Sequence, residues 1–281
     1  MINSSCPVTL GDVRDHYDEL DRFYREIWGE HVHHGLWERG DETAYEAVLN
    51  LIRSVARRGE ITAGKRVCDV GCGYGGTARV LETEFGAVVS AITLSSAQYC
   101  RAVAQRGDAR TPEYLFGDWA SNALPSGTFD TVISIESSEH MQDKPTFFDQ
   151  AQRVLKNGRP MVVCAWLAAE DSTNSHRRHL LEPICREGRL PGMGTENDYR
   201  KWFSDANLEV ESFEDVSAQV RKTWAICLVR ILRSVFRRPE YTRFLFSAAA
   251  RNRVFLLTMI RIWLAYILGA MRYGIFKARK R

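Results

Sequence analysis

A glycine-rich segment is the part of this chain best suited to hold a ligand. Asp69-Val-Gly-Cys-Gly-Tyr-Gly-Gly-Thr77 places four glycines within six positions, after the apolar run Val67 to Val70 and before a helical pattern that begins at Thr77. Glycine tolerates positive φ and lets another molecule approach the backbone closely. A glycine turn between a strand and a helix offers amide N–H groups to a ligand. The segment therefore predicts a cofactor-binding loop, with a purely structural turn as the alternative.

The acidic form of this loop indicates which cofactor it binds. The sequence D-V-G-C-G, with Asp69 two residues before Gly71, resembles motif I of class I S-adenosylmethionine (SAM) methyltransferases. A carboxylate and small residues suit SAM, which carries an amino-acid end and a sulfonium but no pyrophosphate. We expect SAM as the cofactor and S-adenosylhomocysteine as its product, with contacts from Asp69, Gly71, Cys72 and Gly73.

The next strand does not end in the acidic residue that many nucleotide-binding folds use to hold ribose hydroxyls. The strand pattern Val88 to Leu94 leads into Thr93-Leu94-Ser95, and Gln98 follows three residues later. We expect the backbone at Thr93 and Leu94, or the side chains of Ser95 and Gln98, to serve the ribose instead. The alternative is that Ser95 caps the following helix and Gln98 is solvated.

A third polar strand end is Gly117-Asp118-Trp119, which follows the apolar run Tyr114 to Phe116. A carboxylate at this place can accept a hydrogen bond from an adenine amino group, and a neighbouring aromatic ring can stack on the base. We therefore expect Gly117, Asp118 and Trp119 beside the adenine. The alternative is an aspartate that makes an Asx turn within its own loop.

The strand pattern Phe129 to Ile135 runs into Glu136-Ser-Ser-Glu-His-Met141, which carries the candidate catalytic groups. His140 lies just past the strand end, where a neutral imidazole could take a proton from a phenol or an amine during methyl transfer. Glu136 and Glu139 are close enough in sequence to orient or tune that imidazole, and Ile135 and Glu136 are expected beside the cofactor as well. A structural histidine is the alternative, because direct displacement requires alignment and desolvation rather than a dedicated base.

The N-terminal region holds a dense group of aromatic and histidine residues. No carboxylate or cysteine completes a metal-ligand set there, so we expect no metal. A lid that closes over the cofactor and excludes water explains the group better. Tyr17 and Tyr24 would offer hydroxyls to the SAM carboxylate. The acceptor side is predicted to include His33, His34 and Trp37, together with Trp166 from a later strand.

The elements that must position these residues alternate along the chain. Strand and helix patterns follow one another from residue 65, which predicts an α/β fold with a mostly parallel sheet and helices on both faces. The resemblance of the glycine loop to motif I implies that this is the Rossmann-like class I methyltransferase fold. Ligands on such sheets bind beyond the carboxyl ends of the strands. We expect a helical lid over residues 1–60 and a SAM-binding core over residues 61–223. The polar stretch Glu170 to Arg178 is interpreted as a surface insertion.

Residues 224–281 differ from the rest of the chain, because they are rich in aromatic residues, leucine, isoleucine and arginine. We expect a helical cap over the acceptor. Its most apolar run, Val254 to Ala270, has 17 residues with Arg261 near its centre, which is short and costly for a spanning helix. A buried helix lining an apolar pocket is the favoured interpretation. Peripheral membrane contact through this basic and aromatic region is the alternative.

Composition limits the class of protein. The 281 residues are 45% hydrophobic and 26% charged, as in soluble globular proteins, and a net charge of +3 gives no argument for nucleic-acid binding. Seven cysteines without a metal spacing favour free thiols in a reducing compartment, and no signal peptide is recognised. We expect a cytoplasmic protein, with membrane-peripheral contact left open. The oligomeric state is not predicted.

Four segments at matching intervals resemble the γ-tocopherol O-methyltransferase-like family of class I SAM methyltransferases. They are Ile27-Trp-Gly-Glu-His-Val-His-His-Gly35, the glycine loop Asp69 to Gly76, Ile92-Thr-Leu-Ser95 and Glu136-Ser-Ser-Glu-His-Met-Gln-Asp-Lys144. The resemblance implies methylation of a small, often prenylated aromatic acceptor, with His140 at the reaction centre. By matched position it also implies SAM contacts from the following residues: Asp69, Gly71, Gly73, Ser95, Gln98, Asp118 and Trp119.

Two departures from the family pattern bear on the acceptor. Lys156-Asn-Gly-Arg-Pro160 replaces the usual P-G-G turn, and Ala165-Trp-Leu replaces a W-C-H-R-like stretch where acceptors are recognised. The favoured reaction is O-methylation of a hydrophobic, prenylated phenol or quinol. The alternatives are C-methylation of an isoprenoid or sterol alkene, N-methylation of an alkaloid or other natural product, and a SAM-fold binding module without activity.

Overall fold

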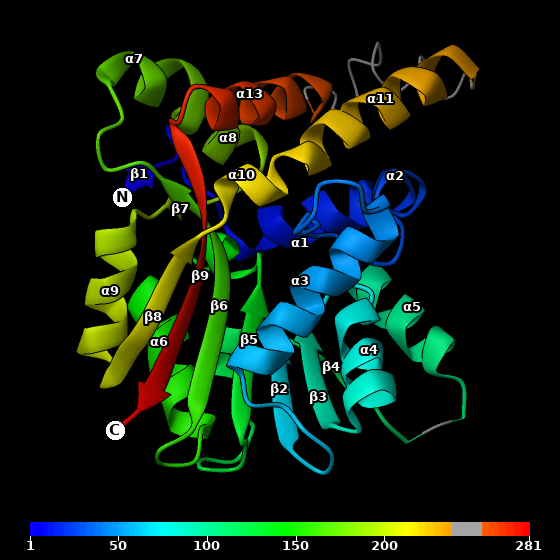
Figure 1. Cartoon of the computed structure of the whole chain (residues 1–281), viewed down its shortest axis with the longest axis vertical. Coiled ribbons are helices and arrows are strands. Elements are labelled where there is room, and N and C mark those ends of the chain that lie inside the picture. Colours follow the sequence, from blue (N-terminus) through cyan, green and yellow to red (C-terminus); the bar gives the residue numbers. More distant parts are fainter. Residues whose placement is uncertain (109, 238–254) are drawn as a thin grey trace.

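A seven-stranded sheet forms the centre of the molecule (Figure 1). The computed structural model describes residues 1–108, 110–237 and 255–281. The strand order is β4-β3-β2-β5-β6-β9-β8, with the first five parallel and β9 antiparallel to both neighbours. The α/β prediction is confirmed. The strands are β2 (Arg66–Val70), β3 (Val88–Thr93), β4 (Glu113–Phe116), β5 (Thr131–Ile135), β6 (Pro160–Ala168), β8 (Leu208–Asp215) and β9 (Met271–Lys280).

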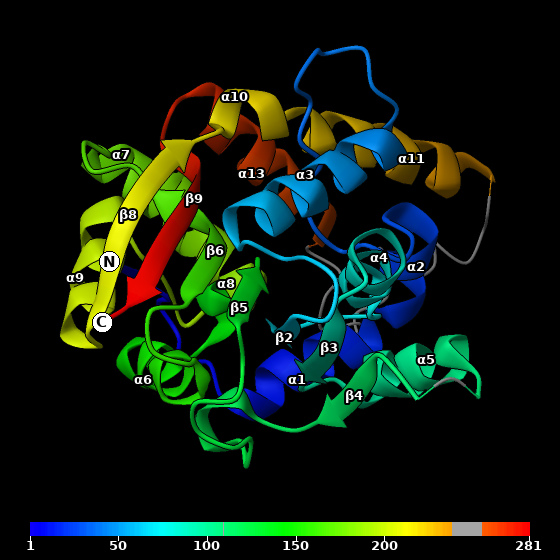
Figure 2. The same ribbon diagram turned by 60° about the horizontal axis from the view of Figure 1, so that its bottom comes forward.

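Helices lie against both faces of this sheet (Figure 2). They bury apolar side chains in two clusters. One core lies under α3 (Ala44–Arg58), α4 (Gly76–Phe85) and α5 (Ser96–Arg106), where Leu51, Ile52 and Leu81 are inaccessible to solvent. The other lies under α6 (Lys144–Val154) and α9 (Glu196–Asp205). Two faces of packed helices fix the strand ends in place, and the candidate site residues lie at those ends.

The remaining elements gather beyond the carboxyl ends of the parallel strands, at the top of Figure 1. Residues 170–178 were expected to form a surface insertion. A helical segment begins within them at Asn174 and continues to Leu181, and its second half packs against α13 (Phe255–Ile267). The longer cap elements are α1 (Leu10–Glu19), α2 (Asp21–Ile27), α8 (Glu182–Glu187), α11 (Lys222–Arg237) and α13 (Phe255–Ile267). The short ones are β1 (Ile2–Asn3), η1 (Trp119–Ser121), η2 (Ser138–His140), α7 (Asn174–His176), η3 (Arg177–Leu181), β7 (Gly192–Met193) and α10 (Ser217–Val220).

The expectation that residues 224–281 form a helical cap is wrong for the last part of the chain. Gly269, with φ +68°, follows α13, and β9 then inserts between β6 and β8. Its nine-residue pairing with β6 buries Tyr273 and Phe276 in the sheet. The basic terminus also forms ion pairs within the protein, since Lys277 pairs with Glu60 at 3.0 Å and with Glu211 at 2.9 Å.

The apolar run around Arg261 forms α13, and the arginine is accommodated by an acid on a neighbouring helix. Arg261 forms an ion pair with Glu187 of α8, and the Thr258 hydroxyl donates to the same carboxylate at 2.8 Å. Met259 and Ile262 are buried on one side of α13, whereas Ile260 on the other side is exposed. The helix is therefore buried on one face only. No helix in the described ranges is long and apolar enough to cross a membrane.

Candidate functional site

The glycine loop connects β2 to α4, and Gly71, Gly73 and Gly75 have positive φ. Gly71 has φ +78°, and a Cβ atom there would lie 2.2 Å from the Ser137 Cβ. The Gly71 and Cys72 amides both donate to the Ile92 carbonyl, at 2.9 and 3.0 Å. These two amides are therefore used within the protein and not offered to a ligand, contrary to the expectation from the motif. At Gly73, a Cβ would meet just the Gln98 amide nitrogen at 3.9 Å, so the loop is open to a ligand there.

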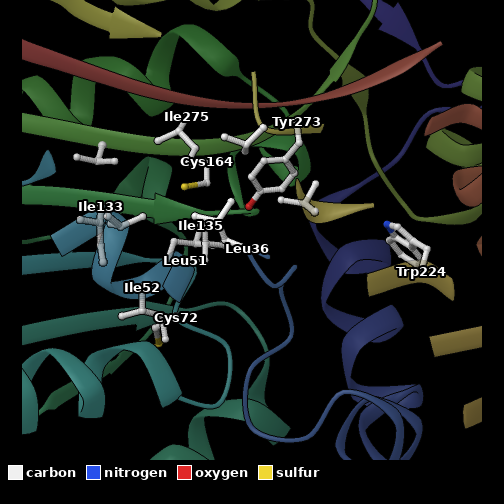
Figure 3. Close-up of a cluster of buried hydrophobic side chains, with 14 of the residues drawn as sticks. Leu36, Leu51, Ile52, Cys72, Ile133, Ile135, Cys164, Trp224, Tyr273 and Ile275 are labelled. Carbon is white, nitrogen blue, oxygen red and sulfur yellow. The ribbon is translucent and has the colours of Figure 1, made fainter. Parts of the chain in front are cut away.

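A cavity, called the first cavity here, lies above the ends of β2, β3, β4 and β5 and under α1. Gln98, Trp119 and His140 approach it from three different strand ends. Three residues predicted to contact the cofactor do not line it: Tyr24, Asp69 and Cys72. Cys72 packs in the core beside Ile52 (Figure 3). The predicted residues that do line it are Tyr17, Gly71, Gly73, Thr93, Leu94, Ser95, Gln98, Gly117, Asp118, Trp119, Ile135 and Glu136.

Asp69 lies beneath this cavity, at the end of β2, with 2% of its surface exposed. Its Oδ2 atom has no hydrogen-bond partner among the residues that the structure describes. Burial raises the pKa of this carboxyl to about 7. A buried carboxylate oxygen without a partner fits a ligand that brings N–H donors, as the amino-acid end of SAM does.

At the strand end that holds Ser95, the structure shows the capping role, and the ribose contact stays a prediction. Ser95 caps α5 by accepting from the Gln98 amide at 3.2 Å, and it donates to Asp18 of α1. Gln98 is buried and not solvated, since Thr93 Oγ1 donates to its Oε1 at 3.0 Å. That bond leaves the Gln98 NH2 group on the side of Gly73. Asp18 thereby ties the lid helix to the edge of the first cavity.

Asp118 and Trp119 are held by local hydrogen bonds. Asp118 Oδ1 accepts from the Ala120 amide at 3.0 Å, which is the local turn considered as its alternative role. The Trp119 indole N–H donates to the Phe147 carbonyl at 3.1 Å, and its side chain is buried. Both residues line the first cavity, and their contact with an adenine stays a prediction.

Tyr17 and His140 lie where the first cavity meets a second one, and both residues line both cavities. The Tyr17 hydroxyl is 2.8 Å from His140 Nε2, and His140 Nδ1 is 3.3 Å from the Arg189 carbonyl. A carbonyl only accepts, so Nδ1 carries the hydrogen and Nε2 accepts from Tyr17. Burial lowers the pKa of His140 to about 3, which keeps the imidazole neutral.

Glu136 is the centre of a buried network between the two cavities. Its backbone has φ +55°, and its carboxylate accepts from the His34 amide and imidazole Nδ1–H, at 2.7 and 2.9 Å. The Trp166 indole donates to it at 2.9 Å and the Tyr273 hydroxyl at 2.7 Å. Burial would raise the pKa of Glu136, but His34 opposes this and the pKa falls to about 2. Glu136 therefore orients His34, not His140 as the sequence suggested.

Glu139 is also turned away from His140. Its Oε1 accepts from the Trp166 amide at 2.5 Å, so it fixes β6 instead of the imidazole. Lys144 lies nearby and donates to three carbonyls, including those of Ser138 at 2.8 Å and Glu139 at 2.6 Å. Burial raises the pKa of Glu139 and lowers that of Lys144. These two groups hold the turn that carries His140.

The second cavity has mainly aromatic and aliphatic walls. His34 and Trp166, predicted on the acceptor side, line it. His33 and Trp37 do not line it, and they line a separate cavity of about 300 Å³ instead. In the described part of the chain, no group of His, Cys, Asp and Glu residues could hold a metal. The second cavity is lined by His16, Tyr17, Tyr24, Trp28, Val32, His34, Glu136, Glu139, His140, Trp166, Ile184, Gly188, Leu190, Trp224, Thr258 and Ile262.

The sequence missed three aromatic residues of the C-terminal region that contact His34 or Glu136. The Trp224 indole donates to His34 Nε2 at 2.6 Å, and the Tyr266 hydroxyl lies 3.4 Å from the same atom. Tyr273 turns its hydroxyl toward Ile135, at the end of β5 (Figure 3). The aromatic content of residues 224–281 was the sole signal for them, and it did not indicate which rings reach His34.

Comparison with known proteins agrees with this architecture. The crystal structure of mycolic acid cyclopropane synthase CmaA1, complexed with SAH and CTAB, superposes with a TM-score of 0.84 at 18% identity, covering 99% of this chain and 100% of that one. The fold is thus that of the SAM-dependent methyltransferases. Residues 7–235 match the family model of mycolic acid cyclopropane synthetase, and the chain belongs to that family.

Two sequence relatives narrow the group. The chain is 31% identical over 232 residues to the chloroplastic tocopherol O-methyltransferase of Arabidopsis thaliana, covering 75% of this chain and 67% of that enzyme. It is 26% identical over 281 residues to 2-methyl-6-phytyl-1,4-hydroquinone methyltransferase of Synechocystis sp., covering 96% and 87%. The resemblance to the tocopherol methyltransferase-like family is confirmed, and the protein is a SAM-dependent methyltransferase.

Proposed function

We propose that this methyltransferase transfers a methyl group to an oxygen of a hydrophobic small molecule, with a prenylated phenol or quinol as the favoured acceptor. The observation that carries the proposal is the Tyr17–His140 pair at the junction of the two cavities. SAM supplies an electrophilic methyl group on its sulfonium. The residues of this chain would bind both reactants, exclude water and take up the proton that the acceptor hydroxyl loses.

The route of that proton follows from the orientation of His140. With Nδ1–H donating to the Arg189 carbonyl, Nε2 is the atom that can accept a proton. The proton would pass to Nε2 directly or through the Tyr17 hydroxyl, 2.8 Å away. Burial keeps the ring neutral and able to accept at neutral pH, but it also weakens the ring as a base. The Glu136 carboxylate acts in the opposite direction, because it favours the imidazolium once that forms.

The walls of the second cavity support an apolar acceptor. Trp28, Trp166 and Trp224 supply large aromatic surfaces, and Ile184, Leu190 and Ile262 supply aliphatic ones. The relatives named for methylation of phytylated rings are consistent with an acceptor of this kind. Tyr17 and His140, which line both cavities, offer polar groups to a hydroxylated ring.

A second candidate function is methylation of a carbon in an isoprenoid or sterol alkene, or of an alkaloid nitrogen. The second cavity favours it in one respect, since aromatic rings and the carboxylates of Glu136 and Glu139 surround a space that would suit a cation. An alkene has no proton to lose before the methyl group is transferred, so Tyr17 and His140 would matter less during that step.

Calorimetric titration with SAM and S-adenosylhomocysteine, followed by transfer of labelled methyl to candidate acceptors, tests the proposal. Micromolar cofactor binding and labelling of a prenylated phenol on oxygen, lost in His140→Ala, is the expected result. Labelling of an alkene carbon or an amine with His140→Ala still active would replace it with the second candidate. A folded protein that binds neither ligand would indicate a SAM-fold binding module.

The same proposal places the enzyme in the cytoplasm, at a membrane surface. All seven cysteines are free thiols, and five of them are buried. Unpaired thiols are typical of a reducing compartment. A prenylated acceptor is strongly apolar and partitions into bilayers, so an enzyme that takes it up benefits from contact with lipid.

A further inference from the structure

The outer surface of α11 and α13 exposes apolar side chains. Val229 and Leu232 of α11 are 45% and 48% exposed, and Leu257 and Ile260 of α13 are 45% and 38% exposed. We call these four residues the outer face. The two helices pack against each other at one end of the molecule (Figure 1). Exposed apolar residues gathered on adjacent helices mark an interaction site more often than scattered ones do.

The charged residues of α11 and α13 themselves have one sign. Neither α11 nor α13 contains an aspartate or glutamate, whereas Lys222, Arg233 and Arg237 of α11 are exposed. This combination of apolar and basic side chains without acids is complementary to a surface that is both apolar and anionic.

A basic groove adjoins the face where α11 begins. Its walls include Arg39, Arg221 and Lys222 together with the aromatic Trp263 of α13, and Glu38 also lines it. The Lys222 ammonium lies 5.5 Å from the centre of the Trp37 ring. Cationic groups beside an indole ring are suited to anionic headgroups, because the charge binds the phosphate and the ring lies in the interfacial region.

The inner sides of the same two helices line the second cavity. Trp224 of α11 and Thr258 and Ile262 of α13 form part of its wall, opposite the outer face. The Arg261 ion pair with Glu187 holds this side of α13 against α8. Both helices therefore contribute residues to the second cavity and to the outer face.

We infer that the outer face and its basic groove dock the protein on an anionic lipid bilayer. Val229, Leu232, Leu257 and Ile260 enter the headgroup boundary, and the lysine and arginine side chains contact the headgroups. The contact is interfacial, in keeping with the lack of a spanning helix in the described ranges. This inference rests on the proposed function in one respect: the lipid surface is taken to be the source of the apolar acceptor.

Co-sedimentation of the full chain with vesicles tests the inference without SAM or acceptor. Vesicles of phosphatidylcholine with phosphatidylglycerol are expected to bind the protein at least about tenfold more tightly than phosphatidylcholine alone, with the difference shrinking at high salt. The variant Val229→Ser/Leu232→Gln should weaken binding by about tenfold through lost apolar contact. Arg233→Gln/Arg237→Gln should remove most of the preference for the anionic lipid.

Val88→Ser is the matched control, because Val88 is 44% exposed at the opposite end of the sheet. It should bind vesicles like the unmodified protein, and thermal melting should show all variants folded. Binding that is absent, indifferent to lipid charge or unchanged by both double variants would overturn the inference. The inference would also be overturned if the unmodified protein were a dimer and Val229→Ser/Leu232→Gln were a monomer, because the outer face would then join two copies of the chain. Methyl transfer to a detergent-solubilised acceptor tests the proposed function separately.

Discussion

The first and second cavities meet at Tyr17 and His140, but they are built in different ways. The first is formed by the ends of neighbouring strands, with one lid helix, α1, closing over it. The second draws on the lid, β6, α8, α11 and α13, joined through the network around Glu136. The cofactor side thus depends on local strand–loop geometry, and the acceptor side on long-range contacts. It follows that changes on one side should leave ligand binding on the other largely intact.

The largest effect is expected at the junction itself. His140→Ala removes the atom proposed to accept the proton, and turnover should fall by about 10²–10⁴-fold, the usual contribution of general acid–base catalysis. SAM affinity, measured by calorimetry, should change by no more than about threefold if the cavities are separable.

Tyr17→Phe is the matched variant for this test. It keeps the aromatic packing of Tyr17 on Tyr24, whose rings stack with centroids 5.4 Å apart, and removes the hydroxyl that bonds His140. A smaller loss of turnover than in His140→Ala is expected, because the imidazole can still take the proton directly. Collapse of SAM binding in His140→Ala would show that the two cavities act as one site. Collapse in Tyr17→Phe alone would indicate that the Tyr17 hydroxyl contacts SAM, as the sequence predicted.

The next largest effect concerns the network that holds the acceptor side together. Glu136→Ala leaves four buried donors without their acceptor, on His34, Trp166 and Tyr273. The free energy of unfolding, measured with urea, should fall by about 3–5 kcal/mol. Glu209→Ala, at an exposed pair with Arg281, should cost less than about 1 kcal/mol. Equal losses in the two variants would contradict a central role for Glu136.

The glycine loop offers a test confined to the cofactor side. Gly73→Val places a branched side chain in the open space of the first cavity and should raise the dissociation constant of SAM by at least about 100-fold, or about 2.7 kcal/mol. Gly158→Val is the control, because Gly158 has φ +69° with open space around it. It carries the same backbone strain away from the site, so its SAM affinity should be unchanged. Intact binding by Gly73→Val would refute the assignment of the loop.

The same contrast explains how much the sequence could predict. Ser95, Gln98 and Gly73 were found from patterns a few residues long, because a strand, its glycine or cap residue and the following helix are adjacent in the chain. Nothing local identifies Trp224 as the donor to His34, since 190 residues separate them. Their contact depends on how α11 crosses the lid, which is decided by packing.

The strand β9 was missed for a related reason. Met271 to Phe276 follows an apolar helix. Its pattern predicts a strand only if another strand of the sheet has an unpaired edge with which it can form hydrogen bonds. That edge is offered by β6, more than a hundred residues earlier in the chain. The direction of Glu136 was equally hidden, because its positive φ is a consequence of the folded turn. Tertiary packing decides both features.

The most gradual effect is the change in the free energy of unfolding with pH. It tests whether the buried carboxylate of Asp69, below the first cavity, is uncompensated. The pKa of Asp69 is raised by burial to about 7, against about 3.9 in an unfolded chain. Folding then favours the protonated form, so its contribution to stability is fully present below about pH 4 and is lost as the pH rises toward 7. The free energy of unfolding should fall by about 1 kcal/mol per pH unit in that window.

Asp69→Asn should remove the part of this slope that Asp69 contributes and leave the part due to Glu139, whose pKa burial also raises. Saturating SAM should reduce the Asp69 part if SAM donors reach the Oδ2 atom that has no partner in the described chain. Urea unfolding at a series of pH values checks both points, with Asp41→Asn as the exposed control. Parallel curves for the unmodified protein and Asp69→Asn would mean that a partner compensates this carboxylate. An Asp69 part of the slope that persists with SAM bound would place the amino-acid end of SAM elsewhere, and the first cavity would then owe its selectivity to shape and not to charge.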